Sequence, residues 1–402
     1  MDNSFSNNST GISIKSDHPG ANIKVISIIN NVIELEQDLR DTTEWWFYWN
    51  FSLHISGDYT GELTFNFLNG EVIGPWGPAI SFDGMQWHWL GSESLINRSS
   101  FVYIPDGTNK IIYFAFSLPY QLNHFELFYN KYKDNKYLNK NILCVSEQGR
   151  QVPIFTLGNP LAGQDIFISC RHHSCESIAS YVLEGFLSYL LDRNLPFMSP
   201  LLRQYMIHIV PFVDLDGVEN GDQGKCRHPH DHNRDYIDKP LYKVTSAIID
   251  YIKSLNLTIG IDIHSLYKWG DICDYPLFMR NLPHADEEVK KLGNIFRQIC
   301  QNNPNKEKVV YEQIYDKFPW DPWGIQNAQN GSYPNIPQFI DKAIKDDMAT
   351  ADAQNYYLRA GAKLALTFET PYFGLINNKI TVSSALSLGC DFAKALEIYV
   401  VN

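Results

Sequence analysis

The stretch DIFISCRHHSCESIASYVLEGFLSY, residues 165–189, places a buried strand directly before a helix. Its first part is a short apolar run that ends at Cys170, and from Ile178 onward apolar residues recur at helical spacing. His173 therefore falls at the turn between the two elements, with Ser174 as the expected N-cap and Glu176 in the first helical turn. A strand followed by a helix is the repeating unit of a sheet whose strands run mostly parallel.

The same unit recurs over the second two thirds of the chain. Strand-like runs are predicted at 152–158, 164–170, 206–213, 257–265 and 363–371, and helical runs at 123–133, 174–192, 240–255, 285–301, 351–362 and 382–397. Because strands and helices alternate, we expect a mixed, mostly parallel sheet flanked by helices, of α/β class. Such sheets bind their ligands at the carboxyl ends of the strands.

The first third of the chain has a different pattern. Short runs rich in aromatic and β-branched residues, such as EWWFYWNFSLHI at 44–55, are separated by turn sequences such as PDGTNK at 105–110. This pattern predicts an antiparallel β-sandwich. The expected organisation is a polar tail at 1–22, a β-sandwich domain at 23–118 and a second, larger domain at 119–402.

Composition excludes several classes of protein. The 402 residues carry a formal net charge of -12 and contain no basic run, which argues against nucleic-acid binding. No apolar stretch approaches the roughly 20 residues of a membrane span, and the polar first residues lead us to expect no secretory signal. The seven cysteines form no CxxC pair, so we expect a reducing compartment and a cytoplasmic location.

The H-x-x-E pair at 173–176 becomes a candidate metal site only together with a second histidine. In LTIGIDIHSL, residues 257–266, apolar residues occupy every second position and so share one face of a strand. Asp262 and His264 share the other face. Taken alone, His264 fits a hydrogen-bonded histidine at the end of a strand as well as it fits a metal ligand. Two histidines and a glutamate from different elements are, however, a zinc-binding set that leaves a fourth position for water.

A base and a set of binding residues are also expected. Glu369 closes a late apolar strand, where a carboxylate is unlikely to be packing material, and it is the candidate general base. The loop at 211–236 crowds together Lys225, Arg227, Asn233 and Arg234, and an Asn-Arg pair suits a terminal carboxylate.

Other readings of these stretches are weaker. Cys175 at a helix start is a candidate nucleophile, but nothing marks a base for it, so we expect Cys175 to be a bystander and His172 to point elsewhere. The alternating histidines 228, 230 and 232 are expected to support the site or only make the loop polar.

These features occur in an order that resembles the zinc carboxypeptidases of the carboxypeptidase A superfamily, peptidase family M14. The motifs are H-x-x-E at 173–176, D-G-V within 214–218, D-x-N-R at 231–234, D-I-H at 262–264 and T-F-E at 367–369. The R-x-H-x-x-E that begins at Arg171, and the aromatic first domain, are similar to the cytosolic carboxypeptidase branch.

The resemblance implies a role for each matched position. His173, Glu176 and His264 would hold one zinc per chain, and Glu369 would activate the water and protonate the leaving amine. Asn233 and Arg234 would hold the substrate's C-terminal carboxylate.

Two positions depart from the family pattern. Gly224 stands where the family has an arginine that polarises the scissile carbonyl, so Arg227 is our first candidate for that catalytic role and Lys225 the second. No tyrosine clearly matches the family's substrate cap; Tyr333 is the candidate, beside the pair Tyr356 and Tyr357.

The expected function is that of a zinc metallocarboxypeptidase that acts on the C-terminus of a peptide or protein, with glutamate or another acidic residue as one candidate preference. Lys342, Lys345 and Arg359 are candidate acid-reading cations. A first alternative is a zinc amidohydrolase of the same superfamily that acts on N-acyl amino acids or peptidoglycan peptides. A second is a binding role for the aromatic first domain, through Trp45, Trp46, Trp49, Trp76, Trp87 and Trp89.

Overall fold

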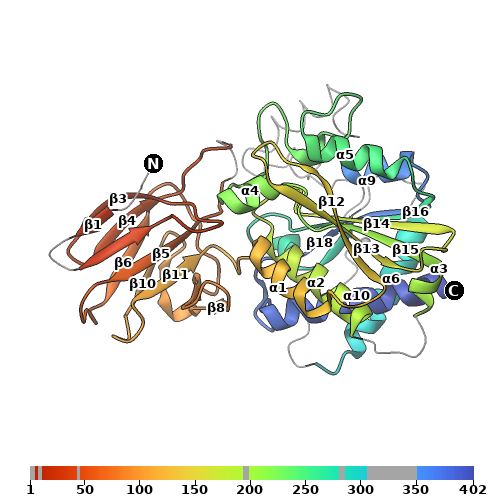
Figure 1. The fold of residues 1–402 in the computed structure, drawn as a ribbon. Coiled ribbons are helices and arrows are strands. Elements are labelled where there is room, and N and C mark those ends of the chain that lie inside the picture. Colours follow the sequence, from red (N-terminus) through yellow and green to blue (C-terminus); the bar gives the residue numbers. More distant parts are fainter. Residues whose placement is uncertain (1–4, 8–10, 43–45, 193–198, 280–285, 306–350) are drawn as a thin grey trace, which may run out of the picture.

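The computed structural model describes residues 5–7, 11–42, 46–192, 199–279, 286–305 and 351–402. Two layered units lie side by side (Figure 1). We call the described residues up to 118 the sandwich and those from 119 onward the mixed-sheet unit. The α/β fold class predicted from the sequence is confirmed. Within the described ranges, no helix combines the length and the apolar character needed to cross a membrane.

The sandwich consists of two sheets. In spatial order the first contains β1 (Phe5–Asn7), β2 (Ile12–Lys15), β5 (Asn50–Ile55), β11 (Ile111–Ala115), β7 (Ala79–Ser81) and β8 (His88–Trp89). The second contains β3 (Lys24–Ile29), β4 (Val32–Glu36), β6 (Leu63–Phe67), β10 (Ser100–Tyr103) and β9 (Leu95–Asn97), with the 3-10 helix η1 (Ser92–Ser94) before β9. Neighbouring strands are antiparallel, apart from the parallel pair β4 and β6.

Aromatic rings join the two sheets. Phe51 and Phe114 of the first sheet face Phe65 and Phe101 of the second, with ring centroids 5.4 to 5.7 Å apart. All four side chains are fully buried, as is Trp49. The aromatic runs of the sequence therefore form the core of the sandwich, which is the usual place for such residues.

The prediction of a polar tail over residues 1–22 is wrong for the part that the structure describes. β2 pairs with β5 along its whole length, from Ile12 opposite Ile55 to Lys15 opposite Ser52. Ile12 and Ile14 alternate with polar residues and point into the core, where both are buried. The surrounding Ser and Asn residues hide this short alternation in the sequence.

The mixed-sheet unit is built on one sheet of seven strands. Its spatial order is β12 (Leu138–Val145), β13 (Gln151–Gly158), β15 (Tyr205–Val210), β14 (Gln164–Cys170), β16 (Leu257–His264), β18 (Leu364–Glu369) and β17 (Leu277–Met279). The four central strands, β15, β14, β16 and β18, are parallel to one another. The outer strands are antiparallel to their neighbours. The carboxyl ends of β14, β16 and β18 thus meet at one edge.

Helices cover both faces of this sheet (Figure 1). One face carries α1 (Leu122–Tyr132), α2 (Ser177–Leu191), α3 (Pro200–Gln204), α6 (Asp286–Asn302) and α10 (Val382–Val401); the other carries α5 (Lys243–Ile252) and α9 (Ala353–Arg359). A Cβ atom on Gly185 or Gly389 would lie within 2.0 Å of a backbone oxygen of the partner helix, so α2 and α10 pack closely only because both residues are glycine.

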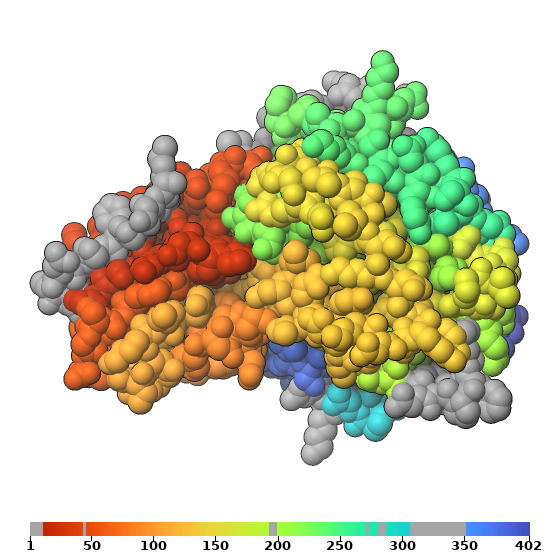
Figure 2. Space-filling model, in the orientation of Figure 1, coloured from red at the N-terminus to blue at the C-terminus, as the bar shows by residue number. Residues whose placement is uncertain are grey.

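The remaining elements lie around the site and the boundary between the units. They are α4 (Leu215–Asn220), the 3-10 helices η2 (His232–Arg234) and η3 (Asp271–Asp274), and the hairpin β19 (Gly374–Leu375) and β20 (Asn378–Lys379). Atoms of the sandwich lie directly against those of the mixed-sheet unit on the face shown in Figure 2. Across the boundary, the indoles of Trp76 and Trp89 donate to the carbonyls of Phe373 (2.9 Å) and Ile380 (2.6 Å).

Candidate metal centre and active site

The candidate site lies where β14, β16 and β18 end. His264 is the last residue of β16 and stands opposite Glu369, the last residue of β18. Cys170 ends β14 beside Ile263, so His173 follows within three residues of the same edge. The strand ends named from the sequence therefore converge in space, as the carboxyl ends of adjacent parallel strands must.

His173, Glu176 and His264 form a compact group of metal-ligand type. Nδ1 of His173 lies 2.9 Å from Oε1 of Glu176, and Nδ1 of His264 lies 2.8 Å from Oε2 of the same carboxylate. One ligand atom from each residue falls within 4.8 Å of the others. Glu176 and His264 are buried, and the imidazole of His173 is 13% exposed.

The charges in this group hold Glu176 ionised. Burial alone would raise the pKa of the carboxyl, but Lys225, His173 and His264 outweigh it and bring the pKa well below its ordinary value. The pKa of His264 is raised, because Asp262 and Glu176 outweigh the effect of burial. A buried, ionised carboxylate with two imidazole nitrogens beside it offers ligands for a cation.

This donor set fits zinc. Two imidazole nitrogens and one carboxylate are a common three-ligand zinc set, which leaves a fourth position for water. Both histidines turn the same atom, Nδ1, toward Glu176. The second nitrogen of His264 is engaged on the other side of the ring, which fixes the orientation of this donor.

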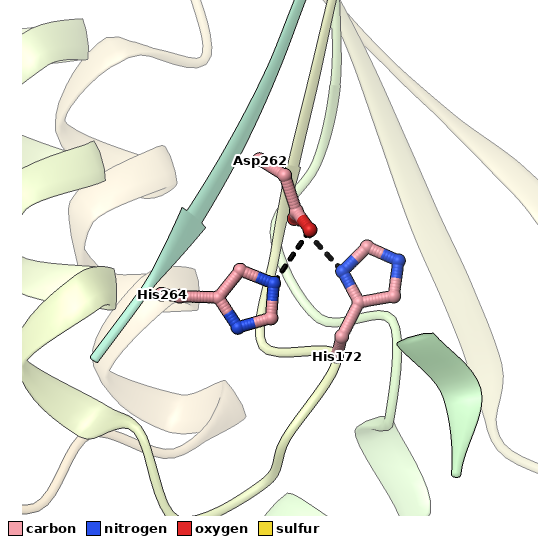
Figure 3. Close-up of side chains that lie close together, drawn as sticks. All are labelled: His172, Asp262 and His264. Atoms are coloured by element: carbon pink, nitrogen blue, oxygen red, sulfur yellow. Dashed lines mark hydrogen bonds and ion pairs between the residues drawn. The ribbon is translucent and has the colours of Figure 1, made fainter. Parts of the chain in front are cut away.

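Asp262 and His172 support His264 from behind (Figure 3). Oδ2 of Asp262 lies 2.5 Å from Nε2 of His264, and Oδ1 lies 2.8 Å from Nδ1 of His172. The two imidazole rings are nearly parallel, at 9°, with centroids 5.5 Å apart. His172 also lies 2.8 Å from the hydroxyl of Tyr236, and Ser169 donates to Asp262 at 2.7 Å.

The sequence suggested Asp262 as a support for His264, because both lie on the same strand face, but it did not reveal the part of His172. His172 was expected to point elsewhere, yet it is fully buried against the carboxylate that orients His264. Together with Asp262 and His264 it forms a second group of metal-ligand type. Hydrogen bonds already occupy both oxygens of Asp262, so we assign this group to orienting His264.

Glu369 has the environment of a base. Its side chain is buried, and Oε2 has no hydrogen-bond partner within the described ranges. Burial, helped by the negative charge of Glu176, raises the pKa of Glu369 to about 7, although His264 and Lys225 oppose the shift. A carboxyl that titrates near neutral pH can both accept and return a proton.

The geometry favours Lys225 over Arg227 as the cation of the site. The amine of Lys225 donates to Glu176 at 2.6 Å and to the carbonyls of Ser265 and Leu266, which follow His264 directly. Its side chain is 13% exposed. Lys225 therefore presents a fixed positive charge next to the metal-ligand group.

Arg227, our first candidate, lies elsewhere. Its guanidinium pairs with Asp214 at 2.7 Å, Asp41 at 2.8 Å and Asp222 at 3.2 Å. These three carboxylates outweigh the effect of burial and raise its pKa. The assignment of Arg227 as the carbonyl-polarising residue is therefore not supported, because three carboxylates hold its fork of donors away from the ligand group.

Asn233 and Arg234 lie on η2, beside His264. Nδ2 of Asn233 is 3.3 Å from Nε2 of His264, and its Oδ1 accepts the backbone N–H of Ala353. Arg234 donates to the carbonyl of Asn233 at 2.7 Å and is half-buried. The pair thus stands at the rim of the metal-ligand group.

Several other sequence candidates fall away from this centre. The hydroxyls of Tyr357 and Tyr356 bond to Ser169 (2.6 Å) and the carbonyl of Ile249 (3.2 Å), so neither is poised to cap a substrate. Arg359 donates to the carbonyl of Tyr236. Burial raises the pKa of Cys175 to about 12, which suits a bystander. Tyr333, Lys342 and Lys345 lie outside the described residues.

The three loop histidines do not converge. His230 lies 2.7 Å from Asp235, and His232 stacks on Tyr242 with centroids 3.7 Å apart. Neither belongs to a metal-ligand group among the described residues. Their contacts stabilise the loop that carries Asn233 and Arg234.

Comparison with known proteins places the chain in a family. A family model described as zinc carboxypeptidase, peptidase M14, matches residues 134–377, more than half of the chain. The chain belongs to the zinc carboxypeptidase family. The family resemblance read from the sequence motifs is thereby confirmed, and the match covers every strand that carries a candidate ligand or base.

Relatives of this zinc carboxypeptidase family member include cytosolic carboxypeptidases. It is 28% identical to cytosolic carboxypeptidase 6 of Mus musculus over 222 residues, and 29% identical to cytosolic carboxypeptidase 1 of Homo sapiens over 143 residues. These matches cover 50% and 31% of this chain, but only 40% and 12% of the two relatives. The chain thus spans less than half the length of these curated relatives.

Solved structures share the whole architecture of this family member. A metallo-carboxypeptidase from Pseudomonas aeruginosa superposes with a TM-score of 0.75 at 18% identity, over 96% of this chain and 99% of the other. One from Burkholderia cenocepacia gives 0.74 at 18% identity, over 97% and 99%. The sandwich and the mixed-sheet unit therefore occur together in other proteins of this fold.

Proposed function

We propose that the protein is a zinc-dependent carboxypeptidase that removes the C-terminal residue of a peptide or protein. The observation that carries the proposal is the convergence of His173, Glu176 and His264 at one strand edge, with the carboxyl of Glu369 on the next strand. Membership of the zinc carboxypeptidase family supports it. We also propose that the sandwich and the mixed-sheet unit are separate domains that meet near residue 118.

Each residue then has a chemical role. A bound zinc would supply a Lewis acid and a water of lowered pKa. Glu369 would accept a proton from the attacking water and return it to the leaving amine; its raised pKa, and its oxygen without a hydrogen-bond partner among the described residues, favour this role. The amine of Lys225 lies close enough to the ligand group to stabilise negative charge that develops on the scissile carbonyl oxygen.

The carboxylate end of the substrate needs its own partners. Arg234 presents a half-buried guanidinium beside Asn233, and together they offer N–H donors to a planar carboxylate. The Pseudomonas aeruginosa neighbour was solved with (2-guanidinoethylmercapto)succinic acid, a compound with two carboxylates. This supports a C-terminal carboxylate as the recognised group. A preference for C-terminal glutamate, and a cytosolic location like that in the names of the relatives, complete the proposal.

The buried tryptophans do not favour a binding role for the sandwich. Trp49, Trp87 and Trp89 are buried, and the indole N–H groups of Trp46 and Trp76 donate to backbone carbonyls. Trp45 lies outside the described residues. Indoles that are packed and hydrogen-bonded do not form a stacking surface.

The test combines metal analysis with a substrate panel. The purified protein should contain about one zinc per chain. His264→Ala should lose it, and an unchanged zinc content in this variant would refute the ligand assignment. Peptides that differ only in the C-terminal residue, glutamate included, should be shortened by one residue. A chelator should prevent this cleavage. Matched peptides with a C-terminal amide should resist cleavage.

Two further substrates test the alternative enzyme class. An N-acyl amino acid and a peptidoglycan stem peptide should be poorer substrates than the best free-acid peptide. Faster hydrolysis of either one would replace the carboxypeptidase proposal with that of an amidohydrolase.

A further inference from the structure

The loop that carries Lys225 is held from the sandwich. This loop, residues 222–227, is here called the Lys225 loop. Asp41 of the sandwich accepts the backbone N–H groups of Gln223 at 3.2 Å and Gly224 at 2.9 Å. The same carboxylate pairs with the guanidinium of Arg227 at 2.8 Å. One side chain of the sandwich thus binds three points of a six-residue loop.

Further contacts across the boundary support this hold. Oε1 of Gln223, a fully buried side chain, accepts the backbone N–H groups of Phe47 at 3.1 Å and Tyr48 at 3.0 Å. The hydroxyl of Thr42 donates to the carbonyl of Cys226 at 3.0 Å. Four residues of the sandwich, Asp41, Thr42, Phe47 and Tyr48, therefore bind the residues on both sides of Lys225.

The other side of the Lys225 loop packs against the metal-ligand segment. The hydroxyl of Ser174 donates to the carbonyl of Asp222 at 2.9 Å, and the backbone N–H of Cys175 donates to that of Gln223 at 3.3 Å. Gly224 has φ +77°, and a Cβ atom there would lie 2.4 Å from the backbone nitrogen of Ser174. The loop fills the space between the sandwich and the segment that carries His173 and Glu176.

We propose that Asp41 of the sandwich is a positioning residue for the active site, which sets the amine of Lys225 against Glu176 through the Lys225 loop. This inference rests on the proposed function, because it gives Lys225 a role beside the metal ligands. The sandwich then completes the site. Lys225 makes one of its bonds to Glu176 and two to the chain after His264, so a small movement of the loop withdraws its charge from both ligands.

The direction in which zinc affinity changes distinguishes a positioning role of Asp41 from a general destabilisation of the fold. A fixed cation beside Glu176 opposes the binding of a second cation there. Lys225→Met should therefore tighten zinc binding by about tenfold. Asp41→Asn keeps one side-chain oxygen but replaces the other with an NH2 group, so it loses one of the two loop N–H bonds and the charge that pairs with Arg227. It should tighten zinc binding in the same direction, and it should have no further effect in the Lys225→Met background.

A matched control and a second measurement complete the test. Asp83 also accepts two backbone N–H groups, at 2.7 and 2.8 Å, but through a single oxygen and within the sandwich itself, so Asp83→Asn should leave zinc affinity unchanged. Affinity is measured by competition with a chromogenic chelator. In metal-free protein, acetylation of the Lys225 amine, quantified by peptide mass spectrometry against Lys110, should be several-fold faster in Asp41→Asn and unchanged in Asp83→Asn.

The outcomes are distinguishable. If Asp41→Asn weakens zinc binding equally with Lys225 and with Met at that position, or leaves the acetylation rate unchanged, the inference is overturned. If the unsubstituted protein binds no zinc, the proposed function fails, and the acetylation rates alone decide whether Asp41 positions Lys225.

Discussion

The carboxylate of Asp262 lies 2.5 Å from Nε2 of His264, two residues further along the same strand. Because side chains alternate on a strand, residues two apart share a face, and Asp262 reaches the ring that it orients without any loop between them. His172 holds the other oxygen of Asp262. The direction of Nδ1 of His264 is thus set by a strand, a carboxylate and a second histidine, all buried.

Replacing His172 should weaken metal binding without touching a ligand. His172→Gln leaves Asp262 less well oriented, so zinc affinity should fall by about tenfold, as measured by chelator competition. His208 gives a matched control, because it lies between Tyr251 and Asp165 at 2.9 Å from each, at the other end of the sheet. An equal loss of affinity in His208→Gln would show that the effect is general destabilisation.

Glu369→Gln should separate metal binding from hydrolysis. The amide keeps the shape of the side chain but cannot take a proton, so peptide hydrolysis should fall by at least about a hundredfold. Zinc content should stay near that of the unsubstituted protein. Activity close to normal in this variant would exclude Glu369 as the base.

Replacing Lys225 should mainly lower the rate of catalysis, whereas replacing Arg227 should mainly lower the stability of the fold. Lys225→Met should lower kcat by about a hundredfold, because a charge beside the reacting carbonyl is lost. Arg227→Gln leaves Asp41, Asp214 and Asp222 without their shared cation and should lower the free energy of unfolding by about 3 kcal/mol. The reverse pattern would restore Arg227 as the catalytic cation. Steady-state kinetics and chemical denaturation measure the two effects.

Gly224 and Gly149 form a matched pair for the Lys225 loop. Both have a positive φ, of +77° and +83°, but a Cβ atom meets backbone only at Gly224. Ala at either position strains the backbone by about 1 kcal/mol. Gly224→Ala should in addition displace the loop and lower activity, whereas Gly149→Ala should leave activity intact. Similar activity in the two variants would show that the loop tolerates displacement.

Asp222 should make stability depend on pH. Burial and the nearby Asp41 raise its pKa from 3.8 to about 7, against the opposing effect of Arg227. Between these two pH values the native chain binds more protons than the unfolded chain, so this carboxyl lowers stability progressively as pH rises to about 7.

Asp222→Asn should remove that slope. Relative to the unsubstituted protein, the variant should gain stability between pH 4 and pH 8, by about 4 kcal/mol as an upper limit. Urea unfolding at the two pH values measures the difference. A constant difference at both values would show that Asp222 is ionised throughout.

Residues with a regular spacing could be predicted from the sequence. The helices and the parallel strands follow from apolar periodicity, and His173, Glu176, His264 and Glu369 were named because each lies where a strand ends or a helix begins. Parallel strands bring their carboxyl ends together whatever the loops do.

Features that depend on long-range contacts could not be predicted. The choice of Lys225 over Arg227 depends on Asp41, about 180 residues earlier, which binds the loop and pairs with Arg227. The role of His172 depends on the path of the chain after Cys170, where Arg171 has φ +61°. β2 was missed because its two isoleucines stand among polar residues and pair with a strand about 40 residues away.

The two indole hydrogen bonds across the boundary have a mechanical consequence. Trp76 and Trp89 hold the carbonyls of Phe373 and Ile380, and Phe373 follows Glu369 by four residues. A pulling force applied to the sandwich would therefore pass directly to the segment that follows β18, as well as to α4, where the carbonyl of Glu219 accepts the N–H of Gly20. In a single-molecule stretching experiment, these two bonds should break in the event that separates the two units.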